Sequence, residues 1–514
     1  MSPSHLAPDA ETKVNVARTQ IRGSSLLLSG RGLAIGAKLI SQTLMVRYLS
    51  TSDYGAWAYA LALVSLLGSF AGLSLDRAVS RFAAIYHQQQ QYDKFFGVLL
   101  LVIGTVLATG FVFATILYLF PGQIESLTGV EKQPLMLLFI LVFLVPIGAL
   151  DDLCTKIFAT FGRAGAIFFR RYVLAPSLQL GVVLLLVLQG ASVSFLAGGW
   201  LVASLLGLAI NGGLLWRVLR EQGLFQSFNL RKVVVPAREV FSFTAPLLTS
   251  DWLTALGSSS GILLLGYFYD TEQVAMLNAV LPIAGLNLLV IQSFEFLFVP
   301  TASRMFAKAD LEGINDLYWR TGVWMAVLSF PVVAVTFLLA TPLTVLLFGD
   351  RYAQSGAILA AMALGNYFQA SLGLNGTTLK VLGKVRYVVV INALAAITNI
   401  VLALVLIPPF GALGAACAIT ATLIIHNLFK QAGLRLAAGF SLVDHNYFRP
   451  YTIIAAGLVT LMVARMLGPD NLVFLAVVTG LVSLTVLILT KRTLGIDDTF
   501  PEIMKIPFLR VILK

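Results

Sequence analysis

Apolar runs of about 20 residues dominate this chain of 514 residues and constrain its fold more than any other feature. A run of that length is what an α-helix needs to cross the hydrocarbon core of a bilayer. Only 11% of the residues are charged, against about 25% in soluble domains. The sequence therefore predicts an all-α polytopic membrane protein. The runs predict about 14 transmembrane helices, at residues 24–46, 56–75, 95–120, 135–158, 167–189, 194–219, 239–267, 275–299, 319–341, 355–378, 386–407, 412–435, 449–467 and 471–490.

The distribution of lysine and arginine favours this topology. Cytoplasmic segments of membrane proteins carry an excess of both residues. With the N-terminus inside, the outer loops hold only Arg47, Lys132, Arg351 and Arg465, and the first span holds Arg31 and Lys38. All others of the 35 lie in inner segments or at the inner ends of the spans. One missed span would move every later loop to the wrong side. The pattern predicts fourteen spans with both termini cytoplasmic.

Several classes of function do not fit this sequence. The longest inner loop, residues 220–237, is too short for a soluble catalytic domain, and the chain has no GxxxxGK[ST] loop of an ATPase. The net charge of +11 is spread over many loops, which favours orientation signals over a nucleic-acid surface. Cys154 and Cys417 lie in apolar runs, and His426 has no second ligand at metal-binding spacing. We expect a membrane transporter, not an enzyme, with no cofactor, no metal and no nucleic-acid partner.

The first twelve spans form two similar halves. Tyr48–Trp57 in the first half falls opposite Phe268–Leu277 in the second, and Ser80–Phe82 opposite Ser303–Met305. Each half has six helices, so both halves start on the same side of the membrane, as in parallel-repeat transporters with the site between the halves. The predicted parts are a cytoplasmic tail (1–23), an N-lobe of helices 1–6 (24–219), a cytoplasmic linker (220–238), a pseudo-symmetric C-lobe of helices 7–12 (239–440), helices 13 and 14 (441–490) and a cytoplasmic tail (491–514).

A polar stripe marks the first predicted helix. Arg31 and Lys38 are seven residues apart, and Gln42 follows four residues later on the same face. A charge at bilayer depth is costly and usually faces a cavity or a partner. The repeat sets this stripe opposite Asp251 and Ser258 on the seventh helix. We expect both stripes to line a central substrate-binding cavity, and we expect Arg31 and Asp251 to form a pair that breaks and re-forms.

A structural role is the alternative for part of this stripe. Arg31 lies about 10 Å into the span at 1.5 Å per residue and could snorkel to the inner surface. Lys38 lies about 21 Å in, which is too deep for easy snorkelling. The sequence therefore favours a cavity-facing role more strongly for Lys38 than for Arg31.

Further charged residues are candidates for ion or proton binding or for gating. Glu295 lies one turn from the inner end of the eighth predicted helix. Asp76, Arg77 and Arg81 follow the second helix and are expected to form an inner rim. A solvated position at the end of a helix is the structural alternative for all of these residues.

Two other sets of polar residues have local interpretations. Asp152 precedes Lys156 by four residues, a spacing that predicts an ion pair within one helix. The tenth predicted helix carries Asn366, Gln369 and Asn375, which could contact sugar hydroxyls or hydrogen-bond to neighbouring helices. The spacing alone leaves both interpretations of the amides open.

Four segments carry a resemblance to a known family. They are Arg47–Gly55, Leu73–Phe82, Val274–Ala279 and Leu347–Gly349. Together they resemble the polysaccharide-transport branch of the multidrug/oligosaccharidyl-lipid/polysaccharide exporter superfamily, and the similarity covers nearly all of the chain. The resemblance implies a flippase that moves polyprenyl-diphosphate-linked oligosaccharide across the cytoplasmic (inner) membrane for cell-surface polysaccharide synthesis, by alternating access of two lobes.

The resemblance also implies partners and leaves alternatives. Arg31 and Lys38 would neutralise the diphosphate, the lipid tail would stay in the bilayer, and polysaccharide polymerase or assembly proteins would be partners of a monomer. A cation-coupled multidrug exporter of the same fold is the first alternative, because Asp251 and Glu295 could bind a cation. A membrane enzyme acting on lipid-linked sugars, or an assembly scaffold, is the second.

Overall fold

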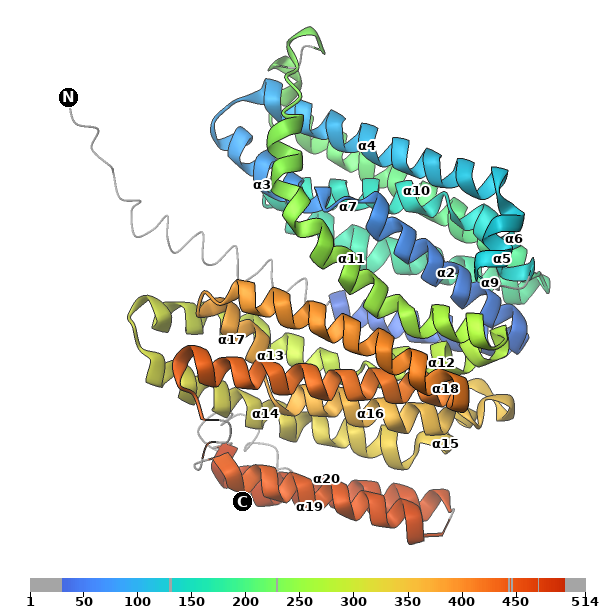
Figure 1. The fold of residues 1–514 in the computed structure, drawn as a ribbon, viewed down its shortest axis with the longest axis vertical. Coiled ribbons are helices and arrows are strands. Elements are labelled where there is room, and N and C mark those ends of the chain that lie inside the picture. Colours follow the sequence, from blue (N-terminus) through green and yellow to red (C-terminus); the bar gives the residue numbers. More distant parts are fainter. Residues whose placement is uncertain are drawn as a thin grey trace. The chain divides into compact units, whose positions relative to one another are not determined.

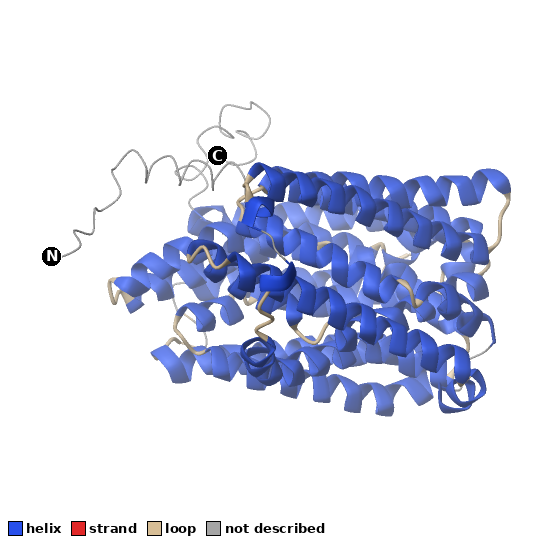
Figure 2. Cartoon of the chain, turned by 90° about the horizontal axis from the view of Figure 1, so that it is seen from above, coloured by secondary structure: helices blue, strands red, loops and turns tan. Residues whose placement is uncertain are grey.

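The computed structural model describes residues 30–128, 132–227, 230–441, 444, 447–469 and 471–494. Every regular element in these ranges is helical (Figure 2). The prediction of an all-α membrane protein is thus confirmed. The predicted N-terminal tail and most of the predicted C-terminal tail, from residue 495 on, lie outside the described residues.

The helices follow the predicted apolar runs (Figure 1). The first half comprises a helical stretch at residues 30–48, α2 (Thr51–Ala71), α3 (Leu75–Gln88), α4 (Tyr92–Leu119), α5 (Pro121–Thr128), α6 (Lys132–Leu141), α7 (Leu144–Thr160), α8 (Ala164–Phe168), the π-helix η1 (Phe169–Leu174), α9 (Ala175–Gln189) and α10 (Val193–Glu221). Two short 3₁₀ turns, η2 (Leu224–Ser227) and η3 (Leu230–Lys232), precede α11.

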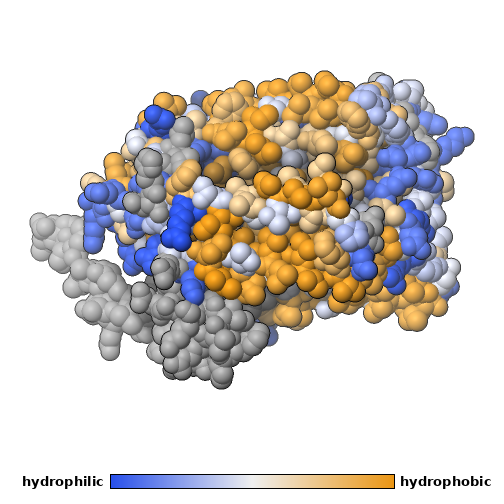
Figure 3. All heavy atoms as spheres, turned by 90° about the horizontal axis from the view of Figure 1, so that it is seen from below, coloured by the Kyte–Doolittle hydropathy of each residue, from blue (hydrophilic) through white to orange (hydrophobic). Residues whose placement is uncertain are grey.

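The rest of the chain, which includes the second half and the two last helices, continues in the same pattern. It comprises α11 (Ala237–Phe268), α12 (Thr271–Ala284), α13 (Asn287–Ala307), α14 (Leu311–Leu338), α15 (Ala340–Phe348), the 3₁₀ turn η4 (Asp350–Tyr352), α16 (Ser355–Ser371), α17 (Asn375–Val381), α18 (Val385–Ala438), α19 (Phe448–Leu467) and α20 (Leu472–Leu494). Hydrophobic side chains cover the middle of the face shown in Figure 3, and hydrophilic ones gather toward both ends. This is the distribution that a bilayer requires.

By length and composition, nine of the described helices could cross a membrane, or up to eleven if each of two bent pairs is one span. Helix α18 counts once, although Gly411 interrupts it with non-helical backbone angles between the predicted spans 386–407 and 412–435. The stretch 30–48 and α11 cover two further predicted runs. The number fourteen stays a prediction.

The two bent pairs each contain a proline. Helices α6 and α7 meet at 41°, and α12 and α13 at 40°. Pro146 lies at the start of α7 and has no N–H to donate to the carbonyl of Val142, which accepts from Val145 instead. Pro282 lies within the last turn of α12 and removes a hydrogen bond there in the same way. The prolines thus account for bends within predicted spans.

The chain divides into two compact units. The first comprises Met1–Leu49, Leu63–Leu127 and Lys132–Asp251; the second comprises Ser50–Ala62, Thr128–Glu131 and Trp252–Lys514. In the first, buried side chains of α3, α4 and α7, such as Phe95 and Ile157, form a common core. In the second, α14 is the most enclosed helix, and Tyr318 and Trp319 are buried in its core. Helices α2 and α11 each contribute to both units.

Within the second unit, the first turns of α2 and α12 pack closely. The Ser52 and Thr271 hydroxyls lie 3.0 Å apart, and Asn278 donates from Nδ2 to the Tyr54 hydroxyl at 2.8 Å. A Cβ at Gly55 would lie 1.7 Å from the carbonyl oxygen of Thr271, so this crossing requires a glycine. These segments are the ones that the sequence repeat sets opposite each other.

Candidate functional site

The helical stretch 30–48 carries the predicted cationic stripe. Gly30 packs against the rings of Phe168 and Tyr172, where a Cβ would come within 2.8 Å of either ring. From this contact onward Arg31 is half-buried, Lys38 is exposed and Gln42 is buried. Among the described residues, the ion pairs include neither Arg31 nor Lys38. Two cations on an apolar helix thus have no carboxylate partner in this part of the chain.

Asp251, by contrast, has two partners within the first unit. Its carboxylate accepts a hydrogen bond from the Ser74 hydroxyl at 2.6 Å and forms an ion pair with the Arg77 guanidinium. The break between α2 and α3 places these donors, because Leu73 and Ser74 both adopt positive φ angles of 45° and 54°. In this structure Arg77, and not the expected Arg31, pairs with Asp251. This sharp reversal of the backbone directs the side chains at the start of α3 toward α11.

The other rim residues on α3 reach different neighbours. Asp76 pairs with Lys156 of α7 at 3.5 Å, and the Arg81 guanidinium lies 4.6 Å from the ring centre of Phe243 on α11. Lys156 thus forms its ion pair with a carboxylate on another helix, and its charge also acts on Asp152, the partner expected within its own helix. The rim residues Asp76, Arg77 and Arg81 connect α3 to α7 and α11, and their gating role stays a prediction.

A buried polar cluster in the first unit was missed from the sequence. Arg170 donates from Nε to Asp151 Oδ1 at 2.9 Å, and Asn211 donates from Nδ2 to the same oxygen at 2.9 Å. Arg170 is only 8% exposed and lies in the π-helix η1, against Gly207. Arg170 was interpreted as an inner-loop charge. Polar residues in three successive predicted spans were the signal that could have revealed the cluster.

The predicted serine on α11 is exposed and makes a local contact. Ser258 donates from Oγ to the carbonyl oxygen of Ala255 at 3.0 Å, within its own helix. On either side of it in the sequence, Gly257 accepts from Asn399 Nδ2 of α18 at its carbonyl oxygen at 2.7 Å, and Ser260 Oγ accepts from the same Nδ2 at 3.0 Å. The polar residues of α11 beyond Asp251 therefore serve partly to join α11 to α18 in the second unit.

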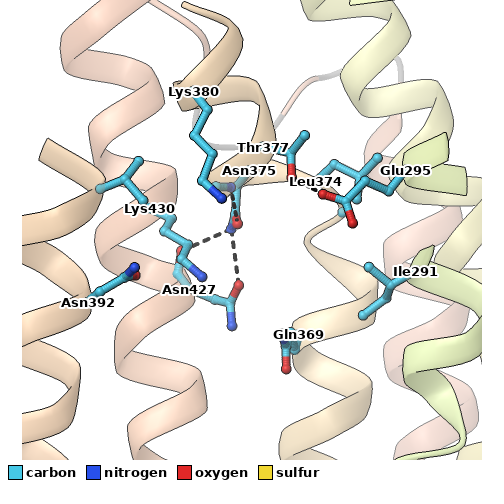
Figure 4. A pocket seen from close by; sticks show the side chains of 13 residues that line it. Ile291, Glu295, Gln369, Leu374, Asn375, Thr377, Lys380, Asn392, Asn427 and Lys430 are labelled. Carbon is cyan, nitrogen blue, oxygen red and sulfur yellow. Dashed lines mark hydrogen bonds between the residues drawn. The ribbon is translucent and has the colours of Figure 1, made fainter. Parts of the chain in front are cut away.

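A polar pocket of about 220 Å³ lies within the second unit (Figure 4). Helices α13, α16, α17 and α18 form its walls. Three charged groups line it, Glu295, Lys380 and Lys430. Among the described residues, none of the three forms an ion pair. Glu295 was predicted as an ion or gating residue, whereas both lysines were interpreted only as orientation signals and were missed.

Carboxamides fill the space between these charges. Asn375 donates from Nδ2 to the Asn427 side-chain oxygen at 3.2 Å, and the Thr377 hydroxyl donates to Glu295 Oε1 at 2.7 Å. Asn375 and Asn427 are only 2% and 1% exposed. Asn375 thus makes the helix–helix contact that the sequence left open, and it lines the pocket as well, as does Gln369. The hydrogen bonds hold the carboxamides and the carboxylate in fixed orientations.

Comparison with known proteins defines the class first. The fold is similar to that of the lipid II flippase MurJ in an inward closed conformation, with a TM-score of 0.69 and 17% identity over 92% of this chain and 100% of that chain. It is also similar to an inward-facing multidrug resistance MATE family transporter of the MOP superfamily, with a TM-score of 0.64 and 14% identity over 78% of this chain and 94% of that one. The chain has the fold of these membrane transporters.

A family model described as polysaccharide biosynthesis protein matches residues 21–306, more than half of the chain. The chain belongs to this family. A curated relative, the succinoglycan biosynthesis transport protein ExoT of Rhizobium meliloti (strain 1021), is 23% identical over 355 residues, which are 68% of this chain and 66% of the relative, just under two thirds of its length. These findings confirm the resemblance seen in the sequence and the expectation of a membrane transporter.

Proposed function

We propose that this protein is a flippase for polyprenyl-diphosphate-linked oligosaccharide in the cytoplasmic membrane, with both termini cytoplasmic. It would export the sugar for cell-surface polysaccharide synthesis by alternating access of its two lobes. Membership of the polysaccharide biosynthesis family and the likeness to a lipid II flippase support this proposal. The cargo is anionic at its diphosphate, so the protein must supply positive charge within the membrane.

The charge balance of the first unit is the observation that carries the proposal. Asp76, Asp151 and Asp251 each pair with a basic side chain from another helix. Arg31 and Lys38, in contrast, form no ion pair among the described residues. The cation that is deepest in its predicted span, Lys38, is also exposed. Because an uncompensated charge in the bilayer is costly, an anionic cargo is a natural partner for this helix.

The same balance disfavours a cation-coupled multidrug exporter. A site for cationic drugs needs a carboxylate that is not already neutralised. Asp251, the acidic residue that kept this alternative open, is held by Arg77 and Ser74. The likeness to a MATE transporter concerns the fold alone. Glu295 is the acidic residue that still supports the multidrug exporter as a second candidate function.

Helix α11 is a suitable element for alternating access. Its part up to Asp251 belongs to the first unit, and its part from Trp252 on belongs to the second. The ion pair with Arg77 holds it at this point of division, and Pro246 lies one turn earlier. A proline frees a backbone carbonyl and permits bending. We propose that breaking of the Arg77–Asp251 pair accompanies the bending of α11 during transport.

A reconstituted flipping assay tests the proposal. The full-length protein is placed in vesicles that carry a fluorescent polyprenyl-diphosphate-linked sugar, and loss of the label to a membrane-impermeant quencher is followed. Lys38→Gln is expected to slow flipping by about tenfold or more, because a hydrogen bond to a charged group contributes roughly 1.5–3 kcal/mol. Lys308→Gln, an exposed lysine after α13, is the matched control.

Several results would contradict the proposal. Flipping at the wild-type rate in Lys38→Gln and Arg31→Gln would remove the role of the cationic stripe. An absence of flipping in the wild-type protein, together with drug efflux that Glu295→Gln abolishes, would favour the multidrug exporter. Sugar transfer or hydrolysis without flipping would favour the enzyme.

A further inference from the structure

The pocket of the second unit has a charge pattern that differs from that of the stripe 30–48. Two ammonium groups and one carboxylate line it, so its formal charge is a single positive one. Figure 4 shows Lys430 and Glu295 on opposite sides, with Asn375 and Asn427 between them. A ligand that fits this pattern carries one negative charge at one end and neutral polar groups at the other.

The uncharged residues that line the pocket further restrict the class of ligand that fits it. Carboxamides both donate and accept hydrogen bonds, and four of them line the pocket, on Gln369, Asn375, Asn392 and Asn427. Asn375, Asn392 and Asn427 also bond within the protein, so each offers a ligand its remaining donors and acceptors. Sugar hydroxyls have the same double capacity. The volume of about 220 Å³ is below the roughly 300–1,000 Å³ of pockets that hold drug-sized ligands. It therefore suits one sugar ring and not a chain of several.

Neither a metal cation nor a diphosphate matches the charges of these residues. A bare cation would meet two lysines, and a diphosphate would meet the carboxylate of Glu295 with more negative charge than the lysines offset. The carboxylate is held by Thr377 at 2.7 Å, which leaves its other oxygen to accept from a ligand hydroxyl. A monoanion with hydroxyl groups satisfies both the lysines and the glutamate.

We propose that this pocket binds a single sugar ring that carries one carboxylate, with the carboxylate at Lys380 and Lys430 and the ring hydroxyls at Glu295 and the carboxamides. This inference rests on the proposed function, since it makes the pocket a subsite for an acidic residue of the oligosaccharide. In the predicted topology both lysines lie at inner helix ends, so the subsite would meet the sugar before it crosses the membrane.

Direct binding of small probes tests this inference. The purified full-length protein in detergent is titrated with sodium glucuronate, glucose, sodium acetate and sodium phosphate at constant ionic strength, and binding is followed by calorimetry and saturation-transfer NMR. Glucuronate is expected to bind more tightly than the other three probes. Lys430→Gln and Lys380→Gln are expected to weaken glucuronate binding by about tenfold or more, because each removes a charged hydrogen-bond donor.

The matched control is Lys384→Gln. Lys384 is an exposed lysine four residues after Lys380 that does not line the pocket, and its substitution should leave glucuronate binding unchanged. Lys430→Arg keeps the charge and should retain most of the binding, which guards against a variant that fails to fold. Gln369→Ala should weaken glucuronate but not acetate, because it removes a lining carboxamide that is offered to the ring.

Three outcomes would overturn the inference. Equal binding of acetate or phosphate and glucuronate would show a simple anion site. Sodium binding that Glu295→Gln abolishes and Lys430→Gln strengthens would show a cation site. An equal loss in Lys384→Gln would show a nonspecific charge effect. Probe binding requires no flipping, so these results are separate from the vesicle assay that decides the proposed function.

Discussion

Replacing Arg170 by glutamine is the sharpest test of the packing described for the first unit. The side chains of Arg170 and Asp151 are only 10% and 22% exposed, and their atoms Nε and Oδ1 lie 2.9 Å apart. Removal of one partner from a buried pair costs about 3–5 kcal/mol, because the other charge stays buried without compensation. Asn211 still donates to the carboxylate, and Asp151 is partly solvated. We therefore expect a loss of about 2–3 kcal/mol in the free energy of unfolding.

Arg171 provides the matched control within the same π-helix. It is exposed, and surface substitutions usually change stability by no more than about 0.5 kcal/mol. Unfolding of both variants is followed in detergent by tryptophan fluorescence, with thermal and denaturant transitions compared. Arg170→Gln should lower the transition clearly, and Arg171→Gln should leave it almost unchanged.

A double-mutant cycle separates the ion pair from simple loss of packing. Asp151→Asn combined with Arg170→Gln removes both charges, so the double variant should be less destabilised than the sum of the single variants. Neighbouring residues in contact show coupling of about 0.5–3 kcal/mol. Equal stability of Arg170→Gln and Arg171→Gln, or strict additivity in the cycle, would refute the reasoning.

Three further perturbations follow from the geometry. Gly55→Ala should reduce the yield of folded protein, because its Cβ would overlap the Thr271 carbonyl, whereas the Cβ of Gly68→Ala on the same helix would meet nothing within 4 Å. Size-exclusion chromatography compares the two variants, and equal profiles would contradict the close crossing of α2 and α12. Arg77→Asp should slow flipping, and Asp251→Arg in the same chain should restore part of the rate; no recovery in the swap would argue against the pair in transport. Lys430→Gln should slow flipping of a cargo with an acidic sugar and leave a neutral cargo unaffected, and an equal effect on both would contradict the subsite.

Much of the fold could be predicted because its causes are local in the sequence. Hydrophobic length locates a membrane helix, so the predicted runs coincide with helices such as α4 and α10. The two bends have a sequence-local cause as well, since Pro146 and Pro282 lie beside them. The sequence did not predict α3 as a separate helix and indicated only charged residues at an inner rim. This helix is polar on one side, and the reversal of the backbone at Ser74 that precedes it has no recognisable sequence pattern.

The candidate site was harder to predict, because ion pairs form between side chains that are close in the folded structure but distant in the sequence. Lys156 has Asp152 at ideal helical spacing, yet it pairs with Asp76 on another helix. Arg170 turns inward in a π-helical segment, where the usual helical period does not apply. Lys430 was assigned to the inner surface by its place in the sequence, although it lies about two turns before the end of α18 and lines the pocket of the second unit.

Two charged positions of different chemistry, the stripe with Arg31 and Lys38 and the pocket with Glu295, would have distinct roles in the proposed flippase. A diphosphate carries concentrated negative charge, so it requires cations that are not already neutralised, and Arg31 and Lys38 form no ion pair within the described part of the chain. A sugar ring needs matched donors and acceptors, and an acidic sugar needs only one net positive charge, which describes the pocket with Glu295 between its amides and lysines. If both groups belonged to one cargo, each position would recognise the part that the other rejects. Selectivity for the lipid-linked sugar would then arise from two weak sites of different chemistry, and neither site would need to bind tightly enough to prevent release.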